Sequence, residues 1–258
     1  MKITAITENT SHNETIGCEH GLSLYIETEN YKLLFDTGQS DLFERNAEKL
    51  GIDLSEVDIA VLSHGHYDHG GGLKRFLSLN SKAPVYLSRF AFEPHYNGTE
   101  KYIGLDTSLR HSDRLIFTDE KYTIDEGLTL FSCNERERKY SFDSSGLNVM
   151  SDGKLIPDDF RHEQYLLIEE NGKRVLISGC SHKGILNITD WFKPDVLVGG
   201  FHFMKLETGE LLRSYAQQLN AFPTEFYTCH CTGTQQYEFM KPIVKRLSYL
   251  SAGQTIEI

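Results

Sequence analysis

The sequence predicts an α/β fold in which two mixed β-sheets pack face to face and helices cover their outer sides. Three observations support this class. Short segments rich in β-branched and aromatic residues open the chain. Later, an Asn171-Gly172 pair separates two further segments of this kind, which is typical of a tight hairpin. Helical and strand-like segments then alternate up to the C-terminus.

The first half of the chain supplies the first sheet and its helices. A plausible tight turn at Glu29-Asn30 joins two of the strands, and Gly51 ends the first helix. The expected strands are Lys2–Thr7, Leu22–Thr28, Tyr31–Phe35 and Val57–Leu62. The expected helices are Gln39–Leu50 and Gly72–Leu79. Between Ser81 and Phe131 the pattern mixes short strands and helices without clear bounds.

The second half begins with a polar segment, Asn134–His162, of weak periodicity. Unstructured segments of this length are usually lids, binding loops or mobile segments, so we expect a cover over the functional site. The hairpin strands Gln164–Glu169 and Lys173–Ser178 follow. The remaining expected elements are Ile185–Phe192, Glu207–Leu219 and Gln235–Leu247 as helices, and Val196–Gly199 and Phe226–Cys229 as strands. Residues 1–258 are expected to form a single domain, with 134–162 as a lid or insertion within it.

Composition excludes several classes of protein. The chain has 258 residues, with 26 Lys and Arg against 37 Asp and Glu, so its net charge is −11. That charge argues against nucleic acid and against an anionic membrane surface as the main partner. The segment Met1–Thr15 lacks the apolar stretch of a secretory signal, and no apolar run is long enough to span a membrane. We expect a cytoplasmic protein that acts on a small molecule, and a homo-oligomer is compatible with the sequence.

Five cysteines, at positions 18, 133, 180, 229 and 231, are too few and too scattered for a disulfide framework. Reduced thiols are therefore expected, and any of them could bind a metal.

Three histidines and an aspartate fall within the segment Ser63–His69, which reads SHGHYDH and follows the expected strand Val57–Leu62. A loop at a strand end can curl so that His64 and His66 face one ion. Asp68 and His69 can then face a second ion beside it. Imidazole and carboxylate are ligands for Zn²⁺, Fe or Mn²⁺. The alternative is a run of surface histidines, but the interleaved aspartate is what a dinuclear site needs.

The pattern His-x-His-x-Asp-His after a strand resembles the signature of the metallo-β-lactamase superfamily. The segment Leu33–Gly38, LLFDTG, resembles the strand-end motif that precedes it in that superfamily. This resemblance implies that Asp36 supports the metal loop by hydrogen bonding. It covers the whole chain and implies the fold expected above, with a centre of two divalent ions. Zn²⁺ is the favoured ion, and Mn²⁺ or Fe²⁺ are alternatives.

The chain departs from the superfamily after the hairpin. Members usually carry Gly-Asp there, and the aspartate bridges both metals, whereas this chain reads Gly179-Cys180-Ser181-His182. Either Cys180 ligates as a thiolate or His182 takes the ligand position. We favour His182 as a ligand and leave Cys180 open between a ligand and a small buried residue.

Later histidines complete the expected centre. His230 follows the strand Phe226–Cys229, where the superfamily has its last metal ligand. Its neighbours Cys229 and Cys231 are expected to point away from it and to pack in the interior. His202, at the end of another strand, is the candidate proton donor to the leaving group. His162 lies near a ligand position of the superfamily but is left out of the expected metal set.

Five short motifs, around residues 19–23, 63–73, 179–185, 199–202 and 229–233, resemble a narrower subgroup. This subgroup comprises metal-dependent hydrolases similar to 7,8-dihydropterin-6-methyl-4-(β-D-ribofuranosyl)aminobenzene-5′-phosphate synthase. Two residues near these motifs are candidates for substrate contact: His20, between the first two strands, and Thr232, at the start of a helix whose free N–H groups could hold an anion. A surface histidine and an ordinary helix cap are the alternatives.

The expected chemistry is hydrolysis through a metal-activated hydroxide, because two adjacent divalent ions lower the pKa of a water to near neutrality. Asp68 would hold the second ion and orient the hydroxide or accept its proton. The expected substrate is a small anionic or cyclic metabolite: an ester, a lactone or a phosphate ester, including the pterin-ribofuranosyl phosphate type. The alternatives are a metal or ligand sensor without turnover and a di-iron oxidoreductase. A nuclease is disfavoured by the charge of −11.

Overall fold

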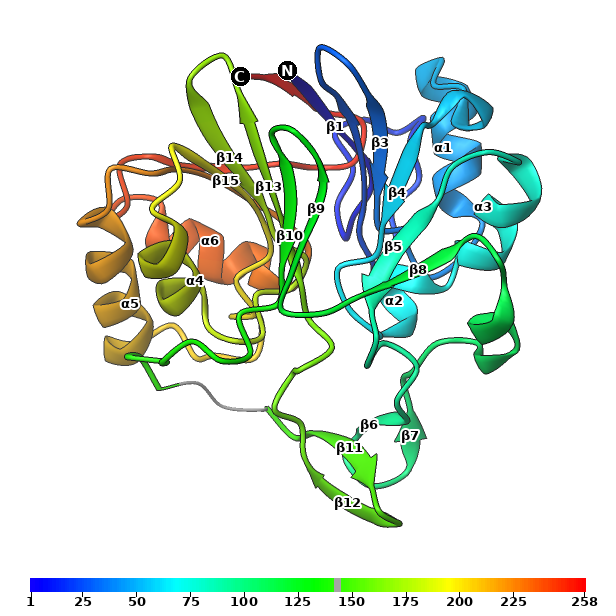
Figure 1. The fold of residues 1–258 in the computed structure, drawn as a ribbon. Helices are drawn as coiled ribbons and strands as arrows, with labels where there is room; N and C mark the ends of the chain where they lie inside the picture. The colour runs from blue at the N-terminus through cyan, green and yellow to red at the C-terminus, as the bar shows by residue number, and fades with distance from the viewer. Residues whose placement is uncertain (142–144) are drawn as a thin grey trace.

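Two seven-stranded β-sheets pack face to face with helices on both outer sides (Figure 1). The computed structural model describes residues 1–141 and 145–258. The two packed sheets with helices outside confirm the architecture predicted from the sequence.

The first sheet holds most of the N-terminal half and has the order β18-β1-β2-β3-β4-β5-β8. The strands β3, β4, β5 and β8 run parallel, and β1 pairs antiparallel with both β2 and β18. Their bounds are Lys2–Thr7 (β1), Ser23–Glu27 (β2), Lys32–Phe35 (β3), Ile59–Val61 (β4), Val85–Ser88 (β5), Leu115–Thr118 (β8) and Thr255–Glu257 (β18).

The second sheet has the order β17-β16-β15-β14-β13-β10-β9. The predicted hairpin forms β13 and β14, and β14 to β17 run parallel. The bounds are Lys121–Asp125 (β9), Leu128–Phe131 (β10), Tyr165–Glu170 (β13), Lys173–Ile177 (β14), Val196–Gly199 (β15), Glu225–Thr228 (β16) and Leu247–Tyr249 (β17).

The helices lie on the outer faces of the two sheets (Figure 1). The first sheet is covered by α1 (Leu42–Leu50) and α3 (Leu73–Leu79), and the second by α4 (Ile185–Phe192), α5 (Glu210–Asn220) and α6 (Thr234–Met240). A single turn, α2 (Tyr67–Gly70), lies in the histidine segment. Short 3₁₀ turns span Leu54–Glu56, Thr107–His111 and His230–Thr232.

The interior between the sheets is apolar because alternate residues of each strand point into it. Leu24, Ile26, Leu33 and Phe35 from the first sheet belong to one buried cluster with Leu166, Ile168, Val175 and Ile177 from the second. Phe43 and Phe76 anchor the helices of the first sheet, and Ile188, Leu212 and Met240 anchor those of the second. This packing holds the strand ends in register at one edge of the sandwich.

The predicted helix Gln235–Leu247 is wrong at its C-terminal end. The helix α6 ends at Met240, and Leu247 begins strand β17 instead. Pro242 accounts for the early end, because it has no backbone N–H with which to continue the hydrogen bonds of the helix.

The segment Asn134–His162 contains regular structure that its weak periodicity did not predict. Strands β11 (Leu147–Ser151) and β12 (Lys154–Pro157) form a hairpin, which joins β6 (His95–Asn97) and β7 (Lys101–Tyr102) in a small sheet of order β12-β11-β6-β7. This accessory sheet projects from one end of the sandwich (Figure 1). Residues 142–144 of the predicted cover lie outside the described residues. The role as a cover stays a prediction.

Among the described residues, we find no helix with the length and apolar character needed to cross a membrane.

Candidate metal centre

The histidines converge at the carboxyl ends of four strands. The segment Ser63–His69 follows β4, Gly179–His182 follows β14, Gly200–His202 follows β15, and Cys229–His230 follows β16. Because β14, β15 and β16 are parallel, their carboxyl ends meet at one edge, where α/β sheets commonly bind ligands.

The backbone near these histidines is strained. Asp36, Ser181, His202 and His230 all have positive φ angles between 48° and 61°. Non-glycine residues rarely adopt this conformation, and such strain gathers at functional sites. Gly65 has a different reason to be glycine, since a Cβ there would lie 2.1 Å from the carbonyl oxygen of Ala91. Because glycine has no Cβ, the loop between His64 and His66 can pass close to the backbone of Ala91.

Two sets of side chains are candidates to hold an ion, and we call them the first and second ligand groups. The first ligand group consists of His64, His66 and His182, all buried. The Nε2 atoms of His64 and His182 lie 3.3 Å apart. A tetrahedral ion with bonds of about 2.0–2.1 Å to nitrogen holds its ligand atoms about 3.3–3.4 Å apart. Burial lowers the pKa of all three imidazoles well below its usual value. Neutral imidazoles are the form that binds a metal, so this group fits a divalent ion.

The second ligand group consists of Asp68, His69, Cys180 and His230. The Nε2 atom of His69 lies 3.2 Å from Nε2 of His230 and 3.2 Å from Sγ of Cys180. The Oδ2 atom of Asp68 is 3.5 Å from His230 Nε2 and 3.8 Å from His69 Nε2. These separations also match those of ligand atoms around one ion. The sequence-predicted ligands thus form two adjacent groups.

Charge differs between the two groups. Burial opposes ionisation of Asp68, but the positive charge of His69 and hydrogen bonds from His20 and His230 outweigh it and hold the pKa of Asp68 well below its usual range. Burial raises the pKa of the Cys180 thiol. The thiolate form of Cys180 therefore needs a nearby cation to offset its charge.

Asp36 lies directly behind the histidine segment. Its carboxylate accepts hydrogen bonds from the backbone N–H and the hydroxyl of Ser63, both at 2.7 Å, and from Nδ1 of His69 at 2.7 Å. Burial lowers the pKa of His69, but Asp36 and Asp68 outweigh that effect and raise it to about 9. Asp36 thus fixes the ring so that Nε2 faces the second ligand group.

Three acceptors that the sequence did not single out hold the other ligands. Glu8 accepts the backbone N–H of His230 at 2.9 Å, and Asn9 lies 2.7 Å from its Nδ1. Glu163 accepts the backbone N–H of His182 at 2.7 Å and that of Lys183 at 3.1 Å. Glu8 and Asn9 are more than 200 residues from His230, and Glu163 is 19 residues from His182, so no short motif joins these acceptors to the histidines they hold.

His20 and His202 lie at the rim of the two ligand groups. Nε2 of His20 is 3.3 Å from Oδ2 of Asp68, and the His20 side chain is 43% exposed. The ring of His202 is 4.3 Å from that of His182. His20 and His202 both line a cavity of about 160 Å³ in front of the ligand groups, together with Lys101 and Lys205.

Thr232 lies inside the fold. Its hydroxyl accepts the backbone N–H of Phe201 at 2.8 Å, and the side chain is fully buried. The structure thus commits this hydroxyl to the turn that carries His202. Substrate contact by Thr232 stays a prediction.

The expectation that Cys231 points away from His230 is wrong. Cys231, Cys180 and His230 can each offer a ligand atom within 4.8 Å of the others, and Cys231 lines the 160 Å³ cavity. The cause is local: residues His230–Thr232 form a 3₁₀ turn rather than an extended segment. Cys229, in contrast, is buried in the core between the sheets.

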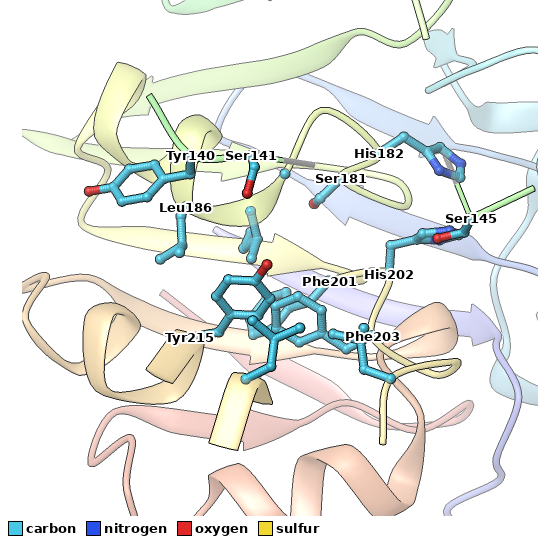
Figure 2. A pocket seen from close by; sticks show the side chains of 14 residues that line it. Tyr140, Ser141, Ser145, Ser181, His182, Leu186, Phe201, His202, Phe203 and Tyr215 are labelled. Atoms are coloured by element: carbon cyan, nitrogen blue, oxygen red, sulfur yellow. The ribbon is translucent and has the colours of Figure 1, made fainter. Parts of the chain in front are cut away.

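An apolar cavity of about 170 Å³ adjoins the ligand groups and shares His182 and His202 with the polar one. Figure 2 shows His182 and His202 on one side of it, Tyr140 and Leu186 on the other, and Phe201 and Phe203 below. Tyr215 also lines it. Stacked aromatic walls suit a flat apolar group.

Comparisons with known proteins identify relatives that match most of the chain. Residues 16–220 match the model of the metallo-beta-lactamase superfamily. An uncharacterized protein of Methanocaldococcus jannaschii is 31% identical in an alignment of 245 residues that covers 90% of this chain and 90% of its own. The 7,8-dihydropterin-6-methyl-4-(beta-D-ribofuranosyl)-aminobenzene-5'-phosphate synthase of the same organism is 26% identical over 100% of this chain and 96% of its own. The crystal structure of Tm1679, a metal-dependent hydrolase of the beta-lactamase superfamily, has a TM-score of 0.85 and 31% identity, covering 100% of this chain and 99% of its own.

Proposed function

Since this chain belongs to the metallo-beta-lactamase superfamily, we propose that it is a metal-dependent hydrolase of a small molecule that joins a flat apolar group to an anionic one. The observation that carries the proposal is the pair of ligand groups. Within them, histidine nitrogens lie 3.2 and 3.3 Å apart, the separation expected around bound divalent ions.

The donor set favours Zn²⁺, with Mn²⁺ or Fe²⁺ as alternatives. Imidazole nitrogen and thiolate sulfur are typical ligands of zinc, whereas Mg²⁺ and Ca²⁺ prefer oxygen ligands. His64, His66 and His182 would hold one ion, and Asp68, His69, Cys180 and His230 the other. Two such ions lower the pKa of a water and stabilise negative charge on the substrate.

The protein's own residues supply the rest of the chemistry. His202 lies beside His182 and lines both cavities, so it is our candidate to donate a proton to the leaving group. Asp68, held by His20, is positioned to orient the attacking water or accept its proton.

Binding of the substrate would divide between the two cavities. The aromatic side chains of Phe201, Phe203 and Tyr215 suit a flat ring. The ammonium groups of Lys101 and Lys205 line the polar cavity and suit a phosphate or carboxylate. One relative is named as the synthase of a dihydropterin-ribofuranosyl aminobenzene phosphate, and this name supports a substrate of the pterin-ribofuranosyl phosphate type.

A substrate panel tests this proposal. Protein loaded with zinc or manganese should hydrolyse at least one member of a set of aryl phosphate mono- and diesters, cyclic phosphates and lactones. His202→Gln should lower kcat by about 10²–10⁴-fold, the range for a lost general acid. The matched control is His111→Gln, on the exposed Thr107–His111 turn, which should leave kcat unchanged. Full metal occupancy without turnover on any ester would favour a sensor instead.

A further inference from the structure

Two cysteines lie together at the second ligand group. Cys180 belongs to that group, and Cys231 directly follows its last histidine, His230. Cys180, His230 and Cys231 can each offer a ligand atom within 4.8 Å of the others, and all three side chains are buried. Cys180 comes after β14 and Cys231 after β16, and both strands run parallel to β15. The sheet therefore brings the two sulfurs to the same edge.

The turn at His230 directs the side chain of Cys231 toward the ligand group. In an extended segment, neighbouring side chains point to opposite sides, so Cys231 would face away from His230. The left-handed conformation of His230, with a φ of 48°, starts a 3₁₀ turn instead. Cys180, His230 and Cys231 consequently line the same cavity of about 160 Å³. Backbone strain of this kind costs about 1–3 kcal/mol and gathers at functional sites.

Gly200 makes room for the sulfur of Cys231. A Cβ at position 200 would lie 2.4 Å from Sγ of Cys231, which is far inside van der Waals contact. The sulfur itself lies 3.5 Å from the carbonyl oxygen of Cys180. A thiol is a weak hydrogen-bond donor, so a metal can replace this contact at little cost. Cys231 is thus held beside Cys180 in a position from which both sulfurs can reach one ion.

The other ligand atoms of the group complete a set that is typical of zinc. Nε2 of His69 lies 3.2 Å from Sγ of Cys180 and 3.2 Å from Nε2 of His230. Together with Cys231 these residues are two cysteines and two histidines, a common ligand set of tetrahedral Zn²⁺. Four ligands from the chain would therefore surround the second ion.

Charge also favours a second sulfur ligand. The first ligand group consists only of imidazoles, which bring no negative charge to an ion. Two adjacent divalent ions in a buried site need anionic ligands, because buried charge without a partner is costly. Asp68 and Cys180 supply part of the negative charge, and a thiolate at Cys231 adds to it. Each thiol releases its proton to solvent when it binds the ion.

We propose that Cys231, like Cys180, is a ligand of the second ion. The two sulfurs, with the imidazoles of His69 and His230, then surround that ion. Asp68 can be a fifth ligand, since zinc in catalytic sites can expand its coordination to five. The inference rests on the proposed metal centre and makes its two positions chemically different. Because thiolates select Zn²⁺ over Mn²⁺, the second ligand group should keep zinc even where the first accepts other divalent ions.

Cobalt in place of zinc tests this proposal. Thiolate sulfur bound to Co²⁺ absorbs in the near ultraviolet through charge transfer, whereas imidazole nitrogen does not. Cys231→Ala and Cys180→Ala should each lose at least about half of this absorbance, since each removes one of two sulfurs. The matched control is Cys229→Ala, which removes a buried cysteine that packs between the sheets on the other side of His230. The control should keep the full absorbance, and full absorbance in Cys231→Ala would overturn the proposal.

A second measurement needs no variant. In crystals of the zinc-loaded wild-type protein, Sγ of Cys231 should lie about 2.3 Å from the zinc ion that His69 and His230 bind. A distance beyond about 3 Å, or a disulfide between Cys180 and Cys231, would overturn the proposal. Protein that binds neither cobalt nor zinc would refute the metal centre itself. Two sulfur ligands without turnover on any ester would refute only the hydrolase, so these failures are distinguishable.

Discussion

Glu163 offers a sharp test of how the hairpin positions His182. Its Oε1 accepts the His182 N–H at 2.7 Å, and its Oε2 accepts the Lys183 N–H at 3.1 Å and the Tyr165 hydroxyl at 2.5 Å. In Glu163→Gln one of these oxygens becomes an NH₂ group. The Tyr165 hydroxyl can turn to accept from it, but one backbone N–H is left without an acceptor.

The expected cost has two parts. A buried donor left without a partner costs about 1–3 kcal/mol. In addition, burial lowers the pKa of Lys183 to about 8, and Glu163 opposes that effect. Removing the negative charge should lower this pKa further, which adds to the cost at neutral pH. We therefore expect Glu163→Gln to lower the free energy of unfolding at pH 7 by at least the cost of the unpaired donor, about 1–3 kcal/mol.

The pH dependence separates the two parts. The pKa of Lys183 is lower in the folded protein than in the unfolded chain. Protonation of Lys183 therefore disfavours the folded state below about pH 8. This penalty fades as the pH rises toward 10.5, the ordinary pKa of lysine. The stability difference between variant and wild type should accordingly shrink between pH 7 and pH 10. The remaining difference is that of the lost hydrogen bond.

Urea unfolding of the metal-free proteins, followed by circular dichroism, measures this difference. Glu169→Gln is the matched control, since Glu169 lies on the same hairpin and its side chain is 53% exposed. The control should stay within about 0.5 kcal/mol of wild type. A Glu163→Gln variant as stable as the control would refute the role we assign to Glu163.

The ligand groups give further predictions. His182→Ala should cost the protein one of its two ions in elemental analysis, because water replaces an imidazole more weakly; full occupancy would remove His182 from the ligand set. Cys180→Ala should weaken metal binding steeply, since the sulfur lies 3.2 Å from Nε2 of His69. If Cys180 only packs, the variant keeps both ions and loses about 1 kcal/mol of stability. Asp36→Ala should lower the free energy of unfolding by about 3–5 kcal/mol, because the buried Ser63 and His69 donors lose their acceptor; a loss below about 1 kcal/mol in denaturant titration would contradict this.

The sequence predicted best what is local. His64, His66, Asp68 and His69 lie within one short segment behind a strand, so their residue types and spacing already suggest two ions. The hairpin β13–β14 was equally readable, because the Asn171-Gly172 turn carries its own signal. For both, neighbours in sequence decide the structure.

Contacts between distant segments were not predictable in the same way. Glu8 reaches the backbone of His230 across 222 residues, and His95 meets Asp158 across 63. A buried acid in a loop carries no local pattern that names its partner. The weak periodicity of Asn134–His162 likewise hid the hairpin β11–β12, because its pairing partner β6 lies about fifty residues earlier.

Two errors had local causes, and only the first of these causes is visible in the sequence. Pro242 lies inside the predicted helix Gln235–Leu247, and α6 ends two residues before it, at Met240. The placement of Cys231 assumed an extended chain, whereas the left-handed backbone of His230, with a φ of 48°, starts a 3₁₀ turn. Single-residue backbone strain of this kind depends on the surrounding fold and leaves little trace in sequence.

The most direct test of the metal centre is anomalous diffraction from crystals of zinc-loaded protein, with data on both sides of the zinc absorption edge. We expect two anomalous peaks per chain, one among His64, His66 and His182 and one among Asp68, His69 and His230. The absence of both peaks, or peaks bound by other side chains, would contradict it.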